Sequence, residues 1–270
     1  MKILFIRHGD PDYVHDSLTE KGWREASALA DFMASENGPG RFADSFYCSP
    51  LGRARDTASL TLKALGRKAE ILDFFREFDV RAKDPHTGKD HVAWDFFPAD
   101  WTKQMDMFDF ERWHQAPIYQ SNPQIPVYYQ KVCQGLDDLL SEHGYVREGY
   151  LYRALNPSHK LIVVFCHFGI TGMLLSHLIN VSPAALLHGA FVPPTGMTLL
   201  ATEERQEGYA SFRMHFMGAC PHLSAAGEPL SGSGLFKECF TDPFERIGTM
   251  ISPLEQTPEW HLDSPVRFDK

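Results

Sequence analysis

Arg7, His8 and Gly9 follow directly on a short apolar run, Ile3-Leu4-Phe5-Ile6, near the start of the chain. Such a run is typical of a buried strand in a parallel sheet, and ligands of open α/β sheets bind just beyond the carboxyl ends of these strands. A neutral imidazole can act as a nucleophile, a guanidinium offers phosphate a planar fork of donors, and glycine permits a close backbone approach. An isolated tripeptide of this kind could equally be an ordinary loop, so the rest of the chain must show whether it belongs to a functional site.

A second apolar run ends in the same way. Leu161-Ile162-Val163-Val164-Phe165 is continuous and rich in β-branched residues, and Cys166-His167-Phe168-Gly169 follows it. Because the carboxyl ends of parallel strands lie at one edge of a sheet, we expect His8 and His167 to converge. Arg53, near the first turn of a predicted helix, would complete a pocket for one phosphoryl group.

The segments around these runs alternate between helix and strand patterns. Thr19 is a suitable N-cap for an amphipathic helix that ends near residues 37–40. Strands are expected at 45–48, 71–72, 160–166, 197–201 and 212–216, and helices at 49–65 and 169–179. This alternation predicts an α/β fold.

Residues 80–150 have a different character. Phe97, Trp101, Met105 and Phe108 have the spacing of one helical face that starts near Pro98, and a second helix is expected from Pro126 to about Glu142. We interpret this region as a helical cap inserted into the α/β frame, with its aromatic face packed on that frame. The tail, 218–270, is rich in Gly, Pro and Ser and is expected to form an irregular wrap with one short helix.

Composition and charge exclude several classes of function. The chain has 270 residues, 43% hydrophobic and 23% charged, which is ordinary for a globular protein. A formal net charge of -9 argues against nucleic-acid binding and favours a small anionic substrate held in a local cationic pocket. No secretory leader or membrane-spanning stretch is evident, so we expect a cytoplasmic protein that does not bind membranes.

The cysteines and histidines show no metal-binding pattern. The five cysteines, which lack a C-x-x-C pair, favour reduced thiols over disulfides or zinc ligands; they are Cys48, Cys133, Cys166, Cys220 and Cys239. The histidines have no spacing such as H-E-x-x-H, so no metal is expected. Cys166 adjoins His167, but neighbours in a strand point to opposite faces, so we expect no Cys-His nucleophilic pair.

Several segments occur in the order shown by one enzyme family. They are Arg7-His8-Gly9, Leu18-Thr19-Glu20-Lys21-Gly22, the stretch from Ser49 to Ala58, Phe75-Arg76-Glu77-Phe78, and the strand that ends at His167. On these segments the chain resembles the histidine phosphatase superfamily, which contains the cofactor-dependent phosphoglycerate mutases and many small phosphatases. The resemblance covers residues 1–80 and 160–200 and leaves the cap and the tail outside it.

The resemblance implies roles for the candidate residues. His8 would be the catalytic nucleophile and form a transient phosphohistidine, while Arg7, Arg53 and His167 would bind the nonbridging oxygens of the phosphate. Glu77 stands where the family carries its proton donor. Asp73 and Asp79 are the competing carboxylates on the same segment.

The chain also departs from the commonest family pattern. Many members continue the Arg-His-Gly motif with Glu-Thr and a longer loop that carries Asn, whereas Asp10-Pro11-Asp12-Tyr13 leads here through a short loop to Leu18. Phosphate contacts from that hydroxyl or amide are therefore not expected. Because loops determine specificity, the natural substrate stays open. Residues of the cap that could contact the leaving group are Arg81, Lys83, His86 and Lys89.

We therefore expect a phosphomonoester hydrolase that acts on a small phosphorylated metabolite, without a metal or other cofactor. The alternatives are a cofactor-dependent phosphoglycerate mutase and a noncatalytic protein that binds a phosphorylated ligand. The expected architecture is one domain over 1–270, a three-layer α/β sandwich with a mostly parallel central sheet, helices on both faces and a helical cap at about 80–150. The sequence leaves open whether the protein is a monomer or a homodimer.

Overall fold

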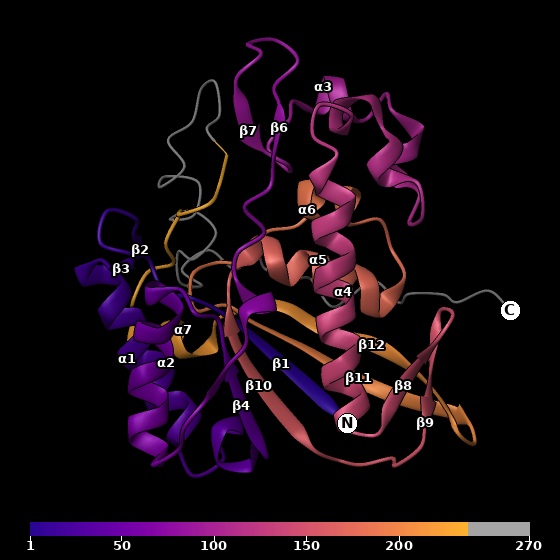
Figure 1. Ribbon diagram of the computed structural model, residues 1–270. Helices are drawn as coiled ribbons and strands as arrows, with labels where there is room; N and C mark the ends of the chain where they lie inside the picture. The colour runs from indigo at the N-terminus through magenta and orange to yellow at the C-terminus, as the bar shows by residue number, and fades with distance from the viewer. Residues whose placement is uncertain (237–270) are drawn as a thin grey trace, which may run out of the picture.

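The computed structural model describes residues 1–236. A central sheet of eight strands crosses it in the order β5-β4-β10-β1-β11-β12-β9-β8 (Figure 1). The strands are β1 (Lys2–Arg7), β4 (Ser45–Cys48), β5 (Glu70–Ile71), β8 (Tyr145–Glu148), β9 (Leu151–Ala154), β10 (Leu161–Cys166), β11 (Met197–Gln206) and β12 (Tyr209–Ala219). Two small hairpins lie outside this sheet, β2 (Pro11–Asp12) with β3 (Ser17–Leu18) and β6 (Arg81–Lys83) with β7 (Asp90–Val92).

Half of the sheet is parallel and half is antiparallel. Four neighbouring strands are parallel, β5, β4, β10 and β1, because a helix returns the chain between successive strands. On the other side of β1 each strand pairs antiparallel with the one before it, in the order β11, β12, β9 and β8. The α/β class with helices on both faces is confirmed, and the sheet is mixed. β1 and β10 are adjacent, with Arg7 opposite Cys166. Their carboxyl ends, each followed by a histidine, therefore lie side by side.

Helices cover both faces of the sheet. They are α1 (Glu20–Ala34), α2 (Gly52–Leu65), α3 (Pro98–Trp101), α4 (Gln124–Glu142), α5 (Phe168–Ile179), α6 (Pro183–Gly189) and α7 (Pro221–Ala226). Leu4 and Ile6 of β1 pack with Leu29 of α1 and Ala58 of α2 on one face. On the other face the alternate residues of β1 join a larger core that contains α4 and α5. This alternation follows from the two-residue period of a strand that is buried on both sides.

The first turn of α1 lies against the loop that follows β1. Thr19 is the N-cap, as expected, and its side chain accepts a hydrogen bond from the N–H of Gly22. A Cβ on Gly9 would lie 2.8 Å from the carbonyl oxygen of Gly22. The absence of a side chain at Gly9 thus allows the loop after His8 to pack directly on the helix.

The insertion between β5 and α4 differs from the helical cap that the sequence predicts. The face expected from Phe97, Trp101, Met105 and Phe108 does not form, because α3 ends at Trp101 and the extended backbone of Gln104 separates it from a 3-10 turn. Phe97, Met105 and Phe108 are exposed. Instead the insertion consists of the β6–β7 hairpin, α3 and four 3-10 turns, with buried Trp94, Phe96, Met107 and Trp113. These turns are Asp73–Phe75, Met105–Phe108, Trp113–Gln115 and Pro117–Tyr119; a further turn, outside the insertion, spans Pro39–Phe42.

The long helix α4 lies close to its expected range, and the strand after it, residues 145–148, belongs to the main sheet and not to the cap. The short helix expected in the tail is α7. The remainder of the expected wrap, 237–270, which includes Cys239, lies outside the described residues. Between residues 1 and 236 no helix is both long and apolar enough to cross a lipid bilayer.

Candidate active site

His8 follows the last residue of β1, and its backbone is held on both sides. Its N–H donates to the carbonyl of Cys166 at 3.0 Å, and its carbonyl accepts from the N–H of Thr195 at 3.1 Å. The ring Nδ1 lies 2.7 Å from the carbonyl oxygen of Gly9. Because a carbonyl can only accept, we assign the proton to Nδ1, which leaves a lone pair on Nε2. A lone pair on Nε2 is what a nucleophile that attacks phosphorus requires.

The surroundings of His8 keep its ring neutral. The residue is 2% exposed. Burial holds the pKa of His8 well below its usual value, and the positive charges of Arg7 and Arg53 lower it further. The imidazole is therefore available as a nucleophile at neutral pH.

His167 lies beside His8 at the N-cap of α5 and is fully buried. The two ring centroids are 5.1 Å apart and the ring planes are inclined at 58°. Nε2 of His167 lies 2.7 Å from Oγ of Ser49, which itself accepts from the N–H of Leu51 at 3.2 Å. We assign the hydroxyl proton of Ser49 to its contact with Nε2, which places the ring proton of His167 on Nδ1.

Nδ1 of His167 is buried and has no hydrogen-bond partner among residues 1–236, and in the assigned tautomer it is a donor. Burial lowers the pKa of His167 well below its usual value, and His8, Arg53 and Arg7 add to this effect. The ring is therefore a neutral donor. A phosphoryl oxygen offers the kind of acceptor that such a buried donor requires.

Arg7 is the last residue of β1 and is 3% exposed. Its Nη1 donates to the carbonyl of Val192 at 2.6 Å, and its guanidinium lies 5.9 Å from the ring centroid of Phe191. Its Nε is buried and has no partner in the described part of the chain. The group is thus held rigidly with donor capacity to spare, which suits an anion-binding guanidinium.

Arg53 enters the site from the first turn of α2. Its Nη1 donates to Oδ1 of Asp16 at 2.6 Å, and its guanidinium lies 5.4 Å from the ring centroid of Tyr13. Oδ2 of Asp16 accepts from the N–H of Gly52, so one carboxylate holds both the helix start and the guanidinium. The shortened loop that departs from the family pattern therefore positions Arg53 through Asp16.

Thr57 connects α2 to the loop that follows His8. Its Oγ1 accepts from the N–H of Gly9 at 2.9 Å and donates to the carbonyl of Arg53 at 2.7 Å. The sequence reasoning named neither Thr57 nor Asp16 as part of the site, nor the bond between Ser49 and His167. Thr57 lies four residues after Arg53, and this helical spacing was the one local signal for it.

Glu77 follows the 3-10 turn Asp73–Phe75, and its carboxyl group lies against the first turn of α5. Its Oε1 accepts from the N–H groups of Ile170 at 2.8 Å and Phe78 at 2.9 Å, and its Oε2 lies 3.4 Å from the N–H of Gly169. Burial raises the pKa of Glu77, although the hydrogen bonds from Ile170 and Phe78 act in the opposite direction. A raised pKa keeps more of the carboxyl protonated, as a general acid requires.

The competing carboxylates are largely exposed and are paired with arginines. The side chain of Asp73 is 84% exposed and pairs with Arg76, and that of Asp79 is 75% exposed and pairs with Arg81. Of the three carboxyl groups, only that of Glu77 accepts hydrogen bonds from backbone N–H groups close to His167. The geometry therefore favours Glu77 as the candidate acid.

Arg7, Arg53 and Glu77 line one cavity of about 690 Å³, and the exposed Asp79 lines it as well. His8 and His167 are buried and do not line this cavity themselves, but each adjoins in the chain a residue that does, Arg7 and Phe168 respectively. Of the four cap residues considered for leaving-group contacts, Arg81 lines the cavity, whereas Lys83 pairs with Asp90 and His86 with Asp100. Lys89 does not line it either.

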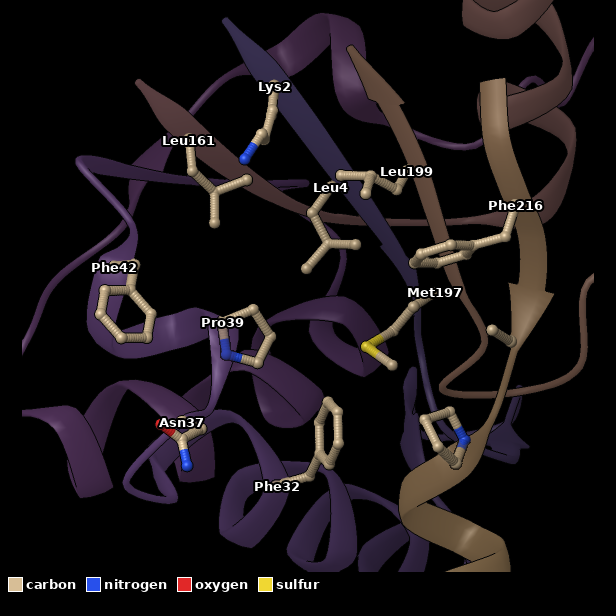
Figure 2. A pocket seen from close by; sticks show the side chains of 12 residues that line it. Lys2, Leu4, Phe32, Asn37, Pro39, Phe42, Leu161, Met197, Leu199 and Phe216 are labelled. Atoms are coloured by element: carbon tan, nitrogen blue, oxygen red, sulfur yellow. The ribbon is translucent and has the colours of Figure 1, made fainter. Parts of the chain in front are cut away.

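A second cavity, of about 510 Å³, lies on the face of the sheet covered by α1 (Figure 2). Leu4, Phe32, Met197 and Phe216 line it, and Lys2 and Asn37 are its polar residues. It contains none of the candidate catalytic side chains. We therefore place the candidate active site at the first cavity and not at the second.

The buried cysteines are unsuited to nucleophilic chemistry. Burial raises the pKa of the Cys48, Cys133 and Cys166 thiols to about 12. Cys166 Sγ lies 3.2 Å from Oγ1 of Thr171. Within residues 1–236, no group of three or more His, Cys, Asp or Glu side chains is arranged to hold a metal ion.

Comparison with known protein families agrees with this geometry. A family model described as "Histidine phosphatase superfamily (branch 1)" matches residues 3–144. The matched range contains Arg7, His8, Arg53 and Glu77, and His167 lies beyond it. None of the curated proteins matches the chain.

Solved structures share the fold. The chain is similar to phosphoserine phosphatase from Entamoeba histolytica, with 20% sequence identity and a TM-score of 0.53 over 82% of this chain and 98% of that one. It is also similar to a mycobacterial glucosyl-3-phosphoglycerate phosphatase, with 17% identity and a TM-score of 0.52 over 81% and 98% of the two chains. At these identities the similarity establishes the fold.

Proposed function

Since the chain belongs to the histidine phosphatase superfamily, we propose that it hydrolyses a small phosphomonoester through a phosphohistidine on His8. Covalent catalysis of this kind divides one difficult displacement into two easier ones. The proposal includes no metal or other cofactor, because His8, the cationic donors and Glu77 together supply a nucleophile, charge stabilisation and a proton.

In the first step, Nε2 of His8 forms a bond to phosphorus while the bond to the ester oxygen breaks. Glu77 gives its proton to the departing oxygen, which leaves as an alcohol. Arg7, Arg53 and Nδ1–H of His167 bind the nonbridging oxygens, where negative charge is distributed during the transfer. By analogy with oxyanion-hole donors, each contributes about 2–4 kcal/mol to lowering the barrier.

In the second step, water attacks the phosphorus of phosphohistidine and the bond from nitrogen to phosphorus breaks. The carboxylate of Glu77, which lost its proton in the first step, takes a proton from this water. Inorganic phosphate leaves, and His8 returns to its neutral state with Nδ1–H still bonded to Gly9.

One observation carries this proposal above the others: the ring orientation of His8. The bond from Nδ1 to the Gly9 carbonyl orients Nε2 as an unprotonated base, and burial keeps the ring uncharged. A histidine that only bound phosphate by charge would be expected to be protonated, as an imidazolium with two N–H donors. The geometry thus favours covalent chemistry over simple binding.

The size of the cavity supports a metabolite as the substrate. A volume of about 690 Å³ is within the usual range for small-molecule sites. The similar structures include a phosphoserine phosphatase and a glucosyl-3-phosphoglycerate phosphatase. Arg81 on the wall of the cavity is positioned to contact the part of the substrate that leaves.

The test is to measure phosphate release from p-nitrophenyl phosphate and from a panel of sugar phosphates, phosphoglycerates, nucleotides and phosphoamino acids, with and without EDTA. We expect phosphate release that EDTA does not reduce and that His8→Ala abolishes. The same preparation is assayed for interconversion of phosphoglycerates with 2,3-bisphosphoglycerate.

Each other outcome overturns a stated part of the proposal. Interconversion that depends on bisphosphoglycerate, without free phosphate, would identify a mutase. A folded wild-type protein that binds phosphate but is inactive on the whole panel would identify a noncatalytic binding protein.

A further inference from the structure

Thr195 has a strained backbone close to the proposed nucleophile. Its φ is +56°, in the left-handed region, and the residue is fully buried. The other described residues with positive φ, glycines apart, are Asp16 and Asn180, which tolerate this region better than a β-branched residue does. Such strain costs about 1–3 kcal/mol and persists only where neighbouring contacts enforce it.

The loop that contains Thr195 holds the backbone of the two central site residues. The N–H of Thr195 donates to the carbonyl of His8 at 3.1 Å, and the carbonyl of Gly196 accepts from the N–H of Arg7 at 3.1 Å. The conformation of Thr195 therefore determines where these two backbone bonds are made. A change in it would shift His8 and Arg7 together.

His222, from the first turn of α7, holds the side chain of Thr195. Its Nε2 lies 2.8 Å from Oγ1 of Thr195, and that hydroxyl lies 2.7 Å from the carbonyl of Pro194. The carbonyl of Pro194 can only accept, so the hydroxyl proton points to it and Nε2 of His222 must be the donor. His222 is 1% exposed and does not line the catalytic cavity.

We propose that His222 is a positioning residue for phosphoryl transfer: its bond to Thr195 enforces the left-handed backbone that places His8 for attack on phosphorus. This inference rests on the proposed function, because it concerns the same nucleophile. A displacement of about 1 Å in a reacting group can reduce a rate about 100-fold. The connection runs from α7 through Thr195 to His8, over residues that are distant in the sequence.

The test is the pre-steady-state burst of p-nitrophenolate from p-nitrophenyl phosphate, which reports the rate at which His8 is phosphorylated. His222→Phe keeps a ring of similar size and removes the donor, and we expect it to slow the burst about 10–100-fold with little change in substrate affinity. His222→Gln offers an N–H at nearly the same distance from the backbone, and we expect it to recover most of the rate. His188→Phe is the matched control, since His188 is also largely buried but bonds to Ala184.

A double-mutant cycle separates positioning from general support of the fold. Thr195→Gly removes the hydroxyl and adopts a positive φ without strain. In that background we expect His222→Phe to cause no further loss of burst rate. All variants are compared below their melting temperatures, which are measured in parallel.

Two results would overturn the inference alone: a His222→Phe variant that melts earlier but phosphorylates His8 at the wild-type rate, or an equal loss of rate in the Thr195→Gly background. A wild-type protein that forms no phosphohistidine would overturn the proposed function and this inference together.

Discussion

The carboxyl group of Glu77 occupies space that exists because residue 169 has no side chain. A Cβ on Gly169 would lie 2.8 Å from Oε1 of Glu77 and 2.4 Å from Cη2 of Trp94. The proposed acid thus reaches the first turn of α5 only because the second residue of that helix is a glycine.

Gly169→Ala should displace Glu77 and Trp94. We expect kcat to fall about tenfold or more for substrates with poor leaving groups, because a misplaced acid protonates the departing oxygen less well. Gly189→Ala is the control, since no atom lies within 4 Å of a Cβ added there. Equal kinetics for the two variants would show that Glu77 does not depend on this packing.

Glu77→Gln removes the proton donor and keeps the size of the side chain. We expect the rate to fall about 100-fold to 10,000-fold for alkyl phosphates and much less for p-nitrophenyl phosphate, whose leaving group needs little help. Because burial raises the pKa of Glu77, the wild-type rate on alkyl phosphates should decline as pH rises through that pKa. The variant should lack this decline; the same loss on every leaving group would reject Glu77 as the acid.

His8→Ala should abolish turnover and leave the fold intact, because among residues 1–236 the ring makes one hydrogen bond, to Gly9. The measurement is incorporation of labelled phosphate that is labile to acid and stable to base, together with circular dichroism. Labelled wild-type protein and unlabelled variant are expected. Label that persists in the variant would place the covalent intermediate on another residue.

Arg81→Gln should raise KM for substrates whose leaving group carries a negative charge, and leave KM for p-nitrophenyl phosphate nearly unchanged. Arg81 lines the cavity from the β6–β7 hairpin, so it can contact the leaving group without contacting the phosphoryl group. Lys83→Gln serves as the comparison, since Lys83 lies on the same hairpin but does not line the cavity. If both variants shift KM alike, the effect comes from the net charge of the hairpin.

His222 should also contribute to stability in a pH-dependent way. Burial lowers the pKa of His222 to about 4, while the unfolded chain has the usual histidine value of about 6.5. Between these values only the unfolded state binds the proton, so the free energy of unfolding decreases as pH falls from about 6.5 to about 4. Chemical denaturation of wild type and His222→Gln at pH 7 and 5 measures this.

The decrease in the free energy of unfolding from pH 7 to pH 5 should be about 2 kcal/mol smaller in His222→Gln than in the wild type. Burial raises the pKa of Glu25 to about 6, and this shift acts on the free energy of unfolding in the opposite direction as pH falls. Glu25 is present in both proteins, so its effect cancels in the comparison. An identical pH dependence in both proteins would mean that His222 is protonated in the folded state.

Local sequence patterns were sufficient for the elements that carry the site. The apolar runs before His8 and His167 are strands β1 and β10, and Thr19 caps α1, because strand burial and helix capping depend on residues a few positions apart. The predicted aromatic helical face in the insertion was wrong. Its spacing was helical, but Gln104 adopts an extended backbone, and the side chains that became buried were others in the same segment.

The sequence by itself therefore determined the strand ends, the identity of the candidate nucleophile and donors, and the family to which they point. Only the tertiary structure decided that Asp16 orients Arg53, that Glu77 rather than Asp73 or Asp79 lies beside His167, and that His222 reaches Thr195 behind His8. The reason is physical: periodicity and capping arise from neighbours along the chain, whereas these contacts form between side chains from separate elements. Their distances are determined by how helices and loops pack on the sheet, and no local pattern records that packing.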